Sequence, residues 1–277
     1  AVRVSLVILV PRTMVAAMRE TLDLPPPYRA VVLREMHDAF AHAQAHAPEA
    51  GAGTLVWVRR FDNLEMAVVL EPGEPLATAR RALYAVMNAA GDALAAHCPP
   101  EKPLAFVWPD TIMLDGGIVG GVRLGWPSDG PAEEPVPWLV AGLMLRLVFP
   151  TTHAGNTGGH PLDIAPQRGT SLEIEGFEQI DAGVLVGSFA RHLMVQFDIW
   201  QERGFKDVGE QYLSRMVPDE GVRRGIDGIG DLLVVRAASR GQTRDADVSS
   251  SAGERRSLET ALRDVQWRDP ESGDPWL

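Results

Sequence analysis

Four arginines occupy positions where a positive charge could hold a bound anion. Arg59 and Arg60 directly follow a glycine-rich stretch, Arg123 follows a glycine pair, and Arg146 lies within an apolar run. A guanidinium binds a carboxylate or phosphate through two parallel hydrogen bonds, but it does not act as a base. Because neighbouring strand residues face opposite sides, only one of Arg59 and Arg60 can point into a given pocket.

A simpler interpretation of these arginines stays open. Arg59, Arg60 and Arg123 fit a solvated strand face, where no ligand is needed. Arg146 differs because its flanks are apolar, and burying an arginine without a partner is costly. For Arg146, an ion-paired or functional role and a purely structural one remain open together.

Glycines and tryptophans close to these arginines could shape a ligand site. Glycine lets the backbone approach a ligand closely, but it is equally suited to tight turns. Tryptophan can form the wall of a ligand slot, but it is equally at home in a hydrophobic core. Both alternatives stay open for Gly51, Gly53, Gly120, Gly121, Trp57 and Trp108.

The histidines and the single cysteine give weaker evidence for a metal site or for thiol chemistry than the arginines give for anion binding. His42 and His46 are spaced four residues apart on one face of an expected helix, near His37, but the sequence fixes no carboxylate or third ligand beside them. We therefore expect no metal site. The single cysteine, Cys98, allows no intramolecular disulfide, and it lacks the basic surroundings that would activate its thiol.

Length and charge limit the architecture and the partners. The chain has 277 residues, enough for one large core and a small extra unit, and a formal net charge of -11. An acidic surface repels phosphate backbones and anionic bilayers, so we expect neither nucleic acid nor membrane as a partner. The apolar run at residues 4–10 is too short to cross a bilayer. We expect a cytoplasmic protein whose residues 1–20 form a poorly structured extension.

The strands and helices that must position the candidate residues do not alternate strictly along the sequence. In residues 75–97 and 183–203, apolar side chains recur every three to four positions, which predicts long helices packed on a sheet. The mixture predicts an α+β fold, with residues 21–217 as the main domain and 218–277 as a small, mostly β C-terminal domain docked on it. Strands are expected at 30–33, 54–61, 65–70, 104–108, 112–114, 118–124, 138–149 and 232–236, and helices at 35–47, 75–97, 183–203 and 205–216.

Several segments together resemble the biotin/lipoate A/B protein ligase family. Residues 107–110 (Val-Trp-Pro-Asp) and 117–121 (Gly-Ile-Val-Gly-Gly) are similar to the two-strand signature of biotin protein ligases, in which each part opens with a lysine. Residues 51–57 lie where the family carries a Gly/Arg-rich loop that ends in tryptophan. The order and spacing of the segments, over residues 24–216, carry the resemblance, and no single motif does.

The resemblance implies a mixed sheet packed with helices and an acyl-transfer reaction. Family ligases join a carboxylic acid (biotin, lipoate or octanoate) to ATP as an acyl-adenylate, then pass the acyl group to a lysine of a biotinyl or lipoyl carrier protein. The carboxylate and the α-phosphate repel each other, so a fixed cation is needed at the reacting centre. Here Ile118 stands where the family has that lysine, and Val107 replaces the first one.

The implied site therefore lacks its usual chemistry, and two functions stay open. Arginines could replace the lysine in an enzyme that attaches or transfers an acyl cofactor. Alternatively, the chain is a non-catalytic relative that binds a small carboxylate or acyl ligand, or a carrier domain; a purely structural subunit is a third, weaker possibility. The residues implied to line the site are Gly51, Gly53, Thr54, Trp57, Arg59, Arg60, Trp108, Asp110, Ile118, Gly120, Gly121, Arg123 and Arg146.

Overall fold

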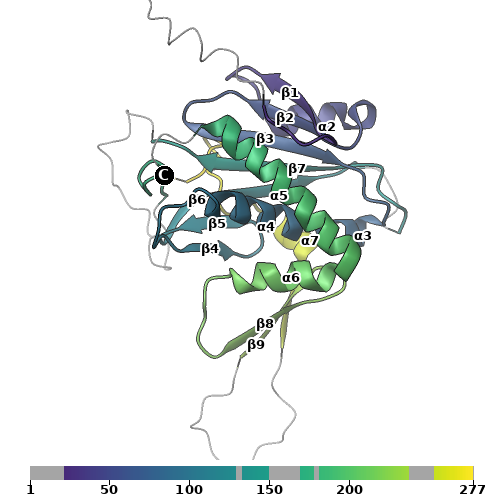
Figure 1. The fold of residues 1–277 in the computed structure, drawn as a ribbon. Helices are drawn as coiled ribbons and strands as arrows, with labels where there is room; N and C mark the ends of the chain where they lie inside the picture. Colours follow the sequence, from purple (N-terminus) through teal and green to yellow (C-terminus); the bar gives the residue numbers. More distant parts are fainter. Residues whose placement is uncertain (1–21, 129–132, 150–168, 178–180, 237–252, 277) are drawn as a thin grey trace, which may run out of the picture.

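A computed structural model describes residues 22–128, 133–149, 169–177, 181–236 and 253–276 (Figure 1). The prediction of a poorly structured extension at residues 1–20 lies outside these residues. The α+β prediction is confirmed, because a large mixed sheet is packed with helices and a smaller sheet follows it in the chain.

The large sheet has seven strands in the order β1-β2-β3-β7-β6-β5-β4. The pair β1–β2 is parallel, and every other pair is antiparallel. Strands β2, β3 and β7 are buried along almost their whole length, so layers must cover both faces of the sheet. The strands are β1 (Arg29–Leu33), β2 (Thr54–Val58), β3 (Asn63–Leu70), β4 (Leu104–Val107), β5 (Thr111–Leu114), β6 (Gly117–Gly125) and β7 (Leu139–Arg146).

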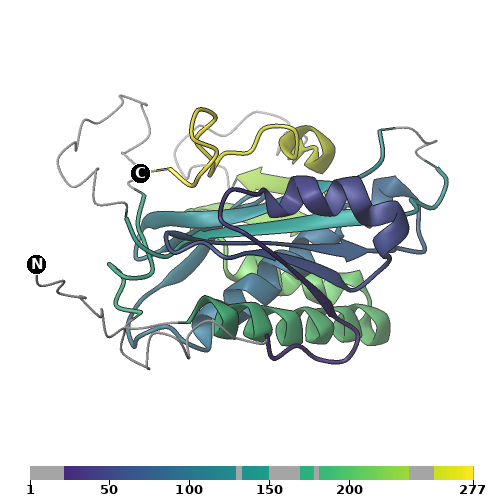
Figure 2. The same cartoon turned by 90° about the horizontal axis from the view of Figure 1, so that it is seen from above.

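Helices cover one face of this sheet, and a mixed layer covers the other. The helical face carries α4 (Ala82–Ala95) and α5 (Ala182–Arg203), with α6 (Phe205–Ser214) beside them (Figure 1). The opposite face carries α2 (Ala39–Ala50) and the last part of the chain (Figure 2). We call this second side the α2 face.

All four predicted helices are found with somewhat different bounds, and two of them differ by more than two residues or are divided. The helix expected at 35–47 begins at Ala39, because the Asp38 carboxylate accepts a hydrogen bond from the N–H of Ala41 (2.8 Å) and caps it. The helix expected at 75–97 is divided into α3 (Leu76–Ala79) and α4. At the junction, the N–H groups of Arg81 and Leu83 each bond to the carbonyl three residues back, which is the tighter 3₁₀ pattern and interrupts the α-helix.

The smaller sheet is docked on the helical side of the main body. It has the order β10-β9-β8, with β8 (Val222–Ile226), β9 (Leu232–Arg236) and β10 (Glu254–Arg256). The Tyr84 hydroxyl donates to the carbonyl of Gly230 (2.5 Å), and the short helix α7 (Leu258–Ala261) adds Leu258 to the main core. After α7 the chain returns to the α2 face as an irregular stretch, residues 264–276, which we call the C-terminal segment (Figure 2).

Candidate functional site

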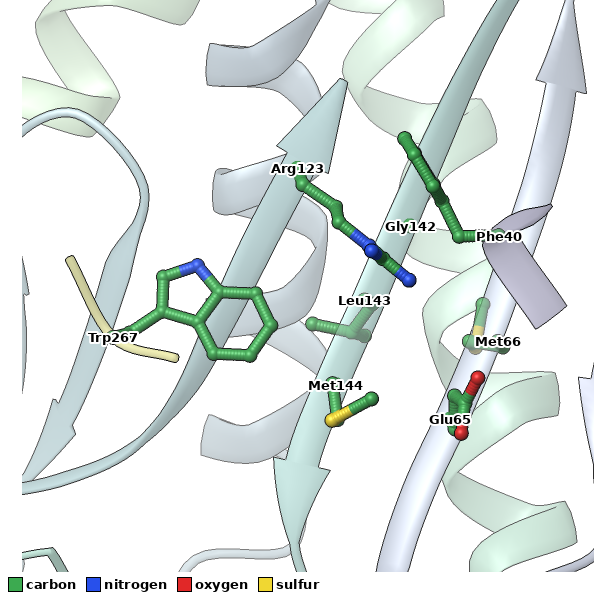
Figure 3. Close-up of a pocket in the computed structure, with 8 residues that line it drawn as sticks. All are labelled: Phe40, Glu65, Met66, Arg123, Gly142, Leu143, Met144 and Trp267. Atoms are coloured by element: carbon green, nitrogen blue, oxygen red, sulfur yellow. The ribbon is translucent and has the colours of Figure 1, made fainter. Parts of the chain in front are cut away.

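A narrow space lies on the α2 face between Phe40 of α2 and Trp267 of the C-terminal segment (Figure 3). Strands β3, β7 and β6 form its floor, with Glu65, Gly142 and Met144 among the lining residues. The space amounts to about 170 Å³ of gaps and contains no room for a water molecule. Ligand pockets for drug-sized molecules usually span ~300–1,000 Å³, so this face is closed as it stands.

Trp267 closes one end of this space. Its side chain is fully buried and packs against Met113, Ile118 and Met144. The indole Nε1–H donates to the carbonyl of Val122 on β6 (3.2 Å), so the polar atom of the ring also has a partner. An apolar slot on the sheet is therefore filled by an aromatic side chain of the same molecule.

Glycines on β6 make room for this close packing. A Cβ at Gly121 would lie only 2.5 Å from the indole Nε1 of Trp267 and would overlap the backbone carbonyl of Asp110. Gly120 has φ 152° at a β-bulge opposite Ile112, and a Cβ there would overlap the backbone carbonyl of Met144. The two glycines thus serve the packing of the sheet and of the C-terminal segment.

Arg146 lies at the end of β7 under the C-terminal segment. Its side chain is 1% exposed and donates to the carbonyl of Pro275, and its Nε–H has no partner among the described residues. Burial lowers the pKa of Arg146, although the charges of Asp274 and Asp62 oppose that effect. No carboxylate of the described residues forms an ion pair with this guanidinium.

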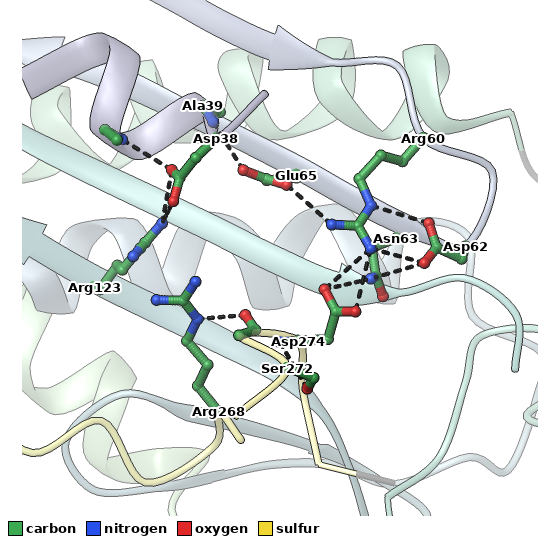
Figure 4. Close-up of polar contacts among 12 residues, drawn as sticks. Asp38, Ala39, Arg60, Asp62, Asn63, Glu65, Arg123, Arg268, Ser272 and Asp274 are labelled. Carbon is green, nitrogen blue, oxygen red and sulfur yellow. Dashed lines mark hydrogen bonds and ion pairs between the residues drawn. The ribbon is translucent and has the colours of Figure 1, made fainter. Parts of the chain in front are cut away.

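The next strand, β3, places Asn63 beside Arg146, and Asn63 belongs to a polar cluster with Arg60, Asp62 and Asp274. Figure 4 shows this cluster. Asn63, directly opposite Arg146 in the register of β3 and β7, donates to Asp274 of the C-terminal segment (3.0 Å). Arg60 forms ion pairs with Asp274 (3.0 Å) and Asp62 (2.7 Å). The hydrogen bond to Asp62 and the nearby charges raise the pKa of Arg60 despite its partial burial. Arg60 therefore stays charged and holds the C-terminal segment.

A second polar pair lies at the α2 end of the space. Arg123 lies over the ring of Phe40 (4.0 Å) and pairs with Asp38 (3.0 Å), which also caps α2. Burial alone would raise the pKa of Asp38, but the Ala41 N–H and Arg123 outweigh it and lower that pKa. Burial raises the pKa of Glu65, although the carboxylate accepts from the N–H of Ala39 (2.8 Å).

Asp110 is a buried carboxyl next to Gly121. Its Oδ1 accepts from the Thr111 hydroxyl (3.2 Å), and its Oδ2 has no hydrogen-bond partner among the described residues. Burial raises the pKa of Asp110 from 3.8 to about 7. With a pKa of about 7, the Asp110 carboxyl is partly protonated at neutral pH. The protonated fraction carries no negative charge with which to bind a cation.

The structure brings about half of the predicted site residues together. The residues gathered on or beside the C-terminal segment are Arg60, Asp110, Ile118, Gly120, Gly121, Arg123 and Arg146. Gly51, Gly53 and Thr54 lie at the opposite end of β2 from Arg60, where a Cβ on Gly53 would overlap the carbonyl of Pro27. Gly53 thus permits a close backbone crossing at the sheet edge.

The two predicted tryptophans pack on the helical face. Trp57 belongs to the main core, and Trp108 donates from its Nε1 to the Tyr84 hydroxyl (2.9 Å). Arg59 lies 5.8 Å from the centre of the Trp57 ring and lines a separate open cleft of about 500 Å³, with Phe61 and Asp181. Arg59 has no ion pair with the described residues, so this cleft offers a free positive charge.

Both lysines of the chain are paired with carboxylates. Lys102 pairs with Asp115 and Glu175, each at 2.8 Å, and exposed Lys206 pairs with Glu210 (3.5 Å). Ile118 is 4% exposed and faces Trp267. On the described part of the α2 face, the positive charges are therefore arginines.

Sequence reasoning missed the residues that close the site. Asn63, Glu65, Trp267, Asp274 and Pro275 come from parts of the chain that no motif connects. One local signal was present: Trp267 stands in a polar stretch between Gln266 and Arg268, and a lone large aromatic there indicates an anchor to another surface. The sequence did not indicate which surface.

Metal ligands and membrane spans are not evident in the described ranges. No cluster of three or more histidine, cysteine, aspartate or glutamate side chains is arranged to hold a metal ion there. The rings of His42 and His46 stack at 4.2 Å, and His46 Nδ1 contacts the carbonyl of His42 (2.8 Å). Among the helices in that part of the chain, none has the length and apolar character needed to cross a bilayer.

Residues 24–214 match the model of the biotin/lipoate A/B protein ligase family, and the chain belongs to that family. A biotin–[acetyl-CoA-carboxylase] ligase of Paracoccus denitrificans is 30% identical over 197 residues, which cover 66% of this chain and 78% of the relative.

Solved structures share the fold at lower sequence identity. A biotin protein ligase-like protein of unknown function from Silicibacter sp. TM1040 is 24% identical, with a TM-score of 0.70 over 87% of this chain and 99% of that one. The biotin protein ligase of Aquifex aeolicus is 16% identical, with a TM-score of 0.55 over 76% and 92% of the two chains. The same enzyme with biotin and ATP has a TM-score of 0.53, at 16% identity over 75% and 91%.

Proposed function

We propose that this protein binds a small carboxylic acid of the biotin–lipoate class on the α2 face and does not activate it as an adenylate. The observation that carries the proposal is the state of Arg146. This guanidinium is buried on the α2 face, where no carboxylate of the described residues pairs with it. Burying an unpaired charge is costly, and a ligand carboxylate is the group that would compensate it.

The surroundings of Arg146 suit an acid with an apolar body. Met113, Ile118 and Met144 form an apolar patch on the same face, which Trp267 covers in this structure. Methionine side chains adapt to ligands of different shape, because they are unbranched and polarisable. Biotin, lipoate and octanoate each combine an apolar body with one carboxylate, which matches this pairing of patch and arginine.

The same residues argue against adenylation. Activation brings a carboxylate against the α-phosphate of ATP, and loss of one electrostatic group at such a centre typically costs about 100- to 1,000-fold in rate. Ile118 replaces the expected lysine, and the nearby Arg60 and Arg123 are already paired with carboxylates of the chain. We therefore propose an acid-binding member of the family, acting through the bound acid or on a carrier domain.

A second candidate is an enzyme that attaches or transfers an acyl cofactor to a biotinyl or lipoyl carrier protein in the cytoplasm. Its support is the 30% identity to the Paracoccus ligase, together with Arg59 in the open cleft. Arg59 lies close to Arg60 in the chain, at the end of β2, and is free of described ion pairs, so it could bind a phosphate of ATP. In this candidate an arginine replaces the family lysine.

Calorimetry with biotin, lipoate, octanoate and ATP, each alone and in acid-plus-ATP pairs, tests both candidates. Binding of one acid that is indifferent to ATP, and that is lost in Arg146→Met, supports the acid-binding proposal. The matched control is Arg263→Met, which removes an exposed arginine that, among the described residues, pairs only with Glu259. Acid binding strengthened by ATP would favour the enzyme. No binding of any acid would contradict the first proposal.

A further inference from the structure

We infer that the C-terminal segment is a built-in competitor for the acid site and must leave the α2 face before an acid can bind. The inference rests on the proposed acid-binding function. The segment combines an apolar ring, the Trp267 indole, with the Asp274 carboxylate, on the same face of the sheet. That is the pairing of groups expected in the acid ligand itself.

The apolar half of the segment fills the apolar half of the site. Trp267 contacts Met113, Ile118 and Met144, which are the side chains proposed to hold the body of the acid. The remaining space beside the indole contains no room for a water molecule. An acid and Trp267 therefore cannot occupy this slot together.

The polar half of the segment takes the hydrogen bonds that an acid would need. Asp274 accepts from Asn63 (3.0 Å) and pairs with Arg60 (3.0 Å) (Figure 4). The carbonyl of Pro275 accepts from Arg146. A carbonyl is a weaker partner for a guanidinium than a carboxylate is. Arg146 is thus covered by a substitute that a true carboxylate can outcompete.

The segment is fixed to the sheet by side-chain contacts. Among the described residues, none of its backbone–backbone hydrogen bonds reaches the seven-stranded sheet. Asp264 N–H bonds to Ala261 of α7 (3.2 Å), and the others stay within the segment: Asp269 N–H to Asp274 (2.9 Å), Gly273 N–H to Asp269 (2.8 Å) and Trp276 N–H to Trp267 (3.1 Å). It therefore forms a closed loop that can move as one unit. Its release breaks no pairing of the seven-stranded sheet, unlike the removal of a strand.

Two measurements on the full-length chain test this competition. Hydrogen exchange with and without saturating biotin, lipoate or octanoate reports whether residues 264–276 become exposed while amides of β6 and β7 stay protected. Calorimetry with the same acids compares the wild type with Asp274→Ala, which removes the contacts of the segment with Arg60 and Asn63. Glu271→Ala is the matched control, because it removes an exposed carboxylate of the same segment that forms no described ion pair.

We expect Asp274→Ala to lower the dissociation constant of the acid about tenfold, which corresponds to about 1.4 kcal/mol, and Glu271→Ala to leave it unchanged. We also expect bound acid to raise exchange in residues 264–276. Equal affinity of wild type and Asp274→Ala, with the segment still protected in the bound state, would overturn the inference and leave the acid-binding proposal standing. No binding of any acid to wild type or Asp274→Ala would overturn both.

Discussion

The indole of Trp267 lies so close to the α-carbon of Gly121 that a methyl group at position 121 would come within 2.5 Å of its Nε1. These residues are far apart in the chain, yet each requires the other. A side chain at position 121 would push the C-terminal segment away from the sheet. A residue smaller than tryptophan at position 267 would leave the apolar slot on the sheet partly empty. The packing of this pair decides whether the α2 face is closed.

Gly121→Ala tests that relationship. The added methyl group meets both the indole and the backbone carbonyl of Asp110, so relief requires the sheet itself to shift. Overpacking of this kind costs about 1–3 kcal/mol, and we expect a loss of at least that size in the free energy of unfolding measured with urea. Gly225→Ala on β8 is the matched strand control, because a Cβ there meets nothing within 4 Å. Equal stability of the two variants would contradict the described packing.

Ile118→Lys tests whether isoleucine at position 118 would by itself account for the proposed lack of adenylation. Position 118 is 4% exposed and faces Trp267, so an ammonium group there would be desolvated. We expect the variant to be destabilised by several kcal/mol and to show no acid-dependent exchange between pyrophosphate and ATP. Ile118→Met, which keeps the site apolar, should stay within about 1.5 kcal/mol of wild type. Exchange activity in a stable Ile118→Lys protein would show that the rest of the ligase site is intact.

Asp110 should make the protein less stable as the pH rises from about 4 to 7. Burial raises the folded-state pKa of Asp110 from 3.8 to about 7, so the folded protein binds the extra proton in this range and the unfolded chain does not. The free energy of unfolding then falls as the pH rises, by an upper limit of about 4 kcal/mol at 1.36 kcal/mol per pKa unit. Urea unfolding at several pH values measures this slope.

Asp110→Asn is the matched variant for that slope, since the amide has nearly the same shape and does not titrate. We expect the stability of Asp110→Asn relative to wild type to increase steadily between about pH 4 and pH 7 and then to level off. The same pH profile in both proteins would show that Asp110 has an ordinary pKa in the folded state.

Tyr84→Phe should loosen the small sheet without unfolding the main body. The Tyr84 hydroxyl donates to the carbonyl of Gly230 (2.5 Å) and accepts from Trp108 Nε1 (2.9 Å), and it is buried. Its removal leaves buried polar atoms without partners, at a cost of about 1–3 kcal/mol. We expect faster hydrogen exchange in β8 and β9 and unchanged exchange in β2 and β3. Uniform loss of protection across the chain would instead mean that the two sheets unfold as one unit.

The sequence by itself determined the elements and the family. Apolar residues every three to four positions marked α5 and the α3–α4 region, and runs of Val, Leu and Met marked β2, β3 and β7, because these patterns follow from local geometry. The start of α2 shows the limit of local patterns: the helix was expected from residue 35, but it begins at Ala39, after the N-cap residue Asp38. The motif order over residues 24–216 agreed with the family match to residues 24–214.

Only the tertiary structure decided which candidate residues share one place. Gly53 and Arg60 are near in sequence, but β2 places them at opposite ends of a strand. Asp274 and Arg60 are separated by most of the chain, but they form an ion pair at 3.0 Å. Contacts of this kind depend on where a polar, irregular segment docks on the sheet. No periodicity encodes that position, because it is set by the shape and charge of a surface assembled from β3, β6 and β7.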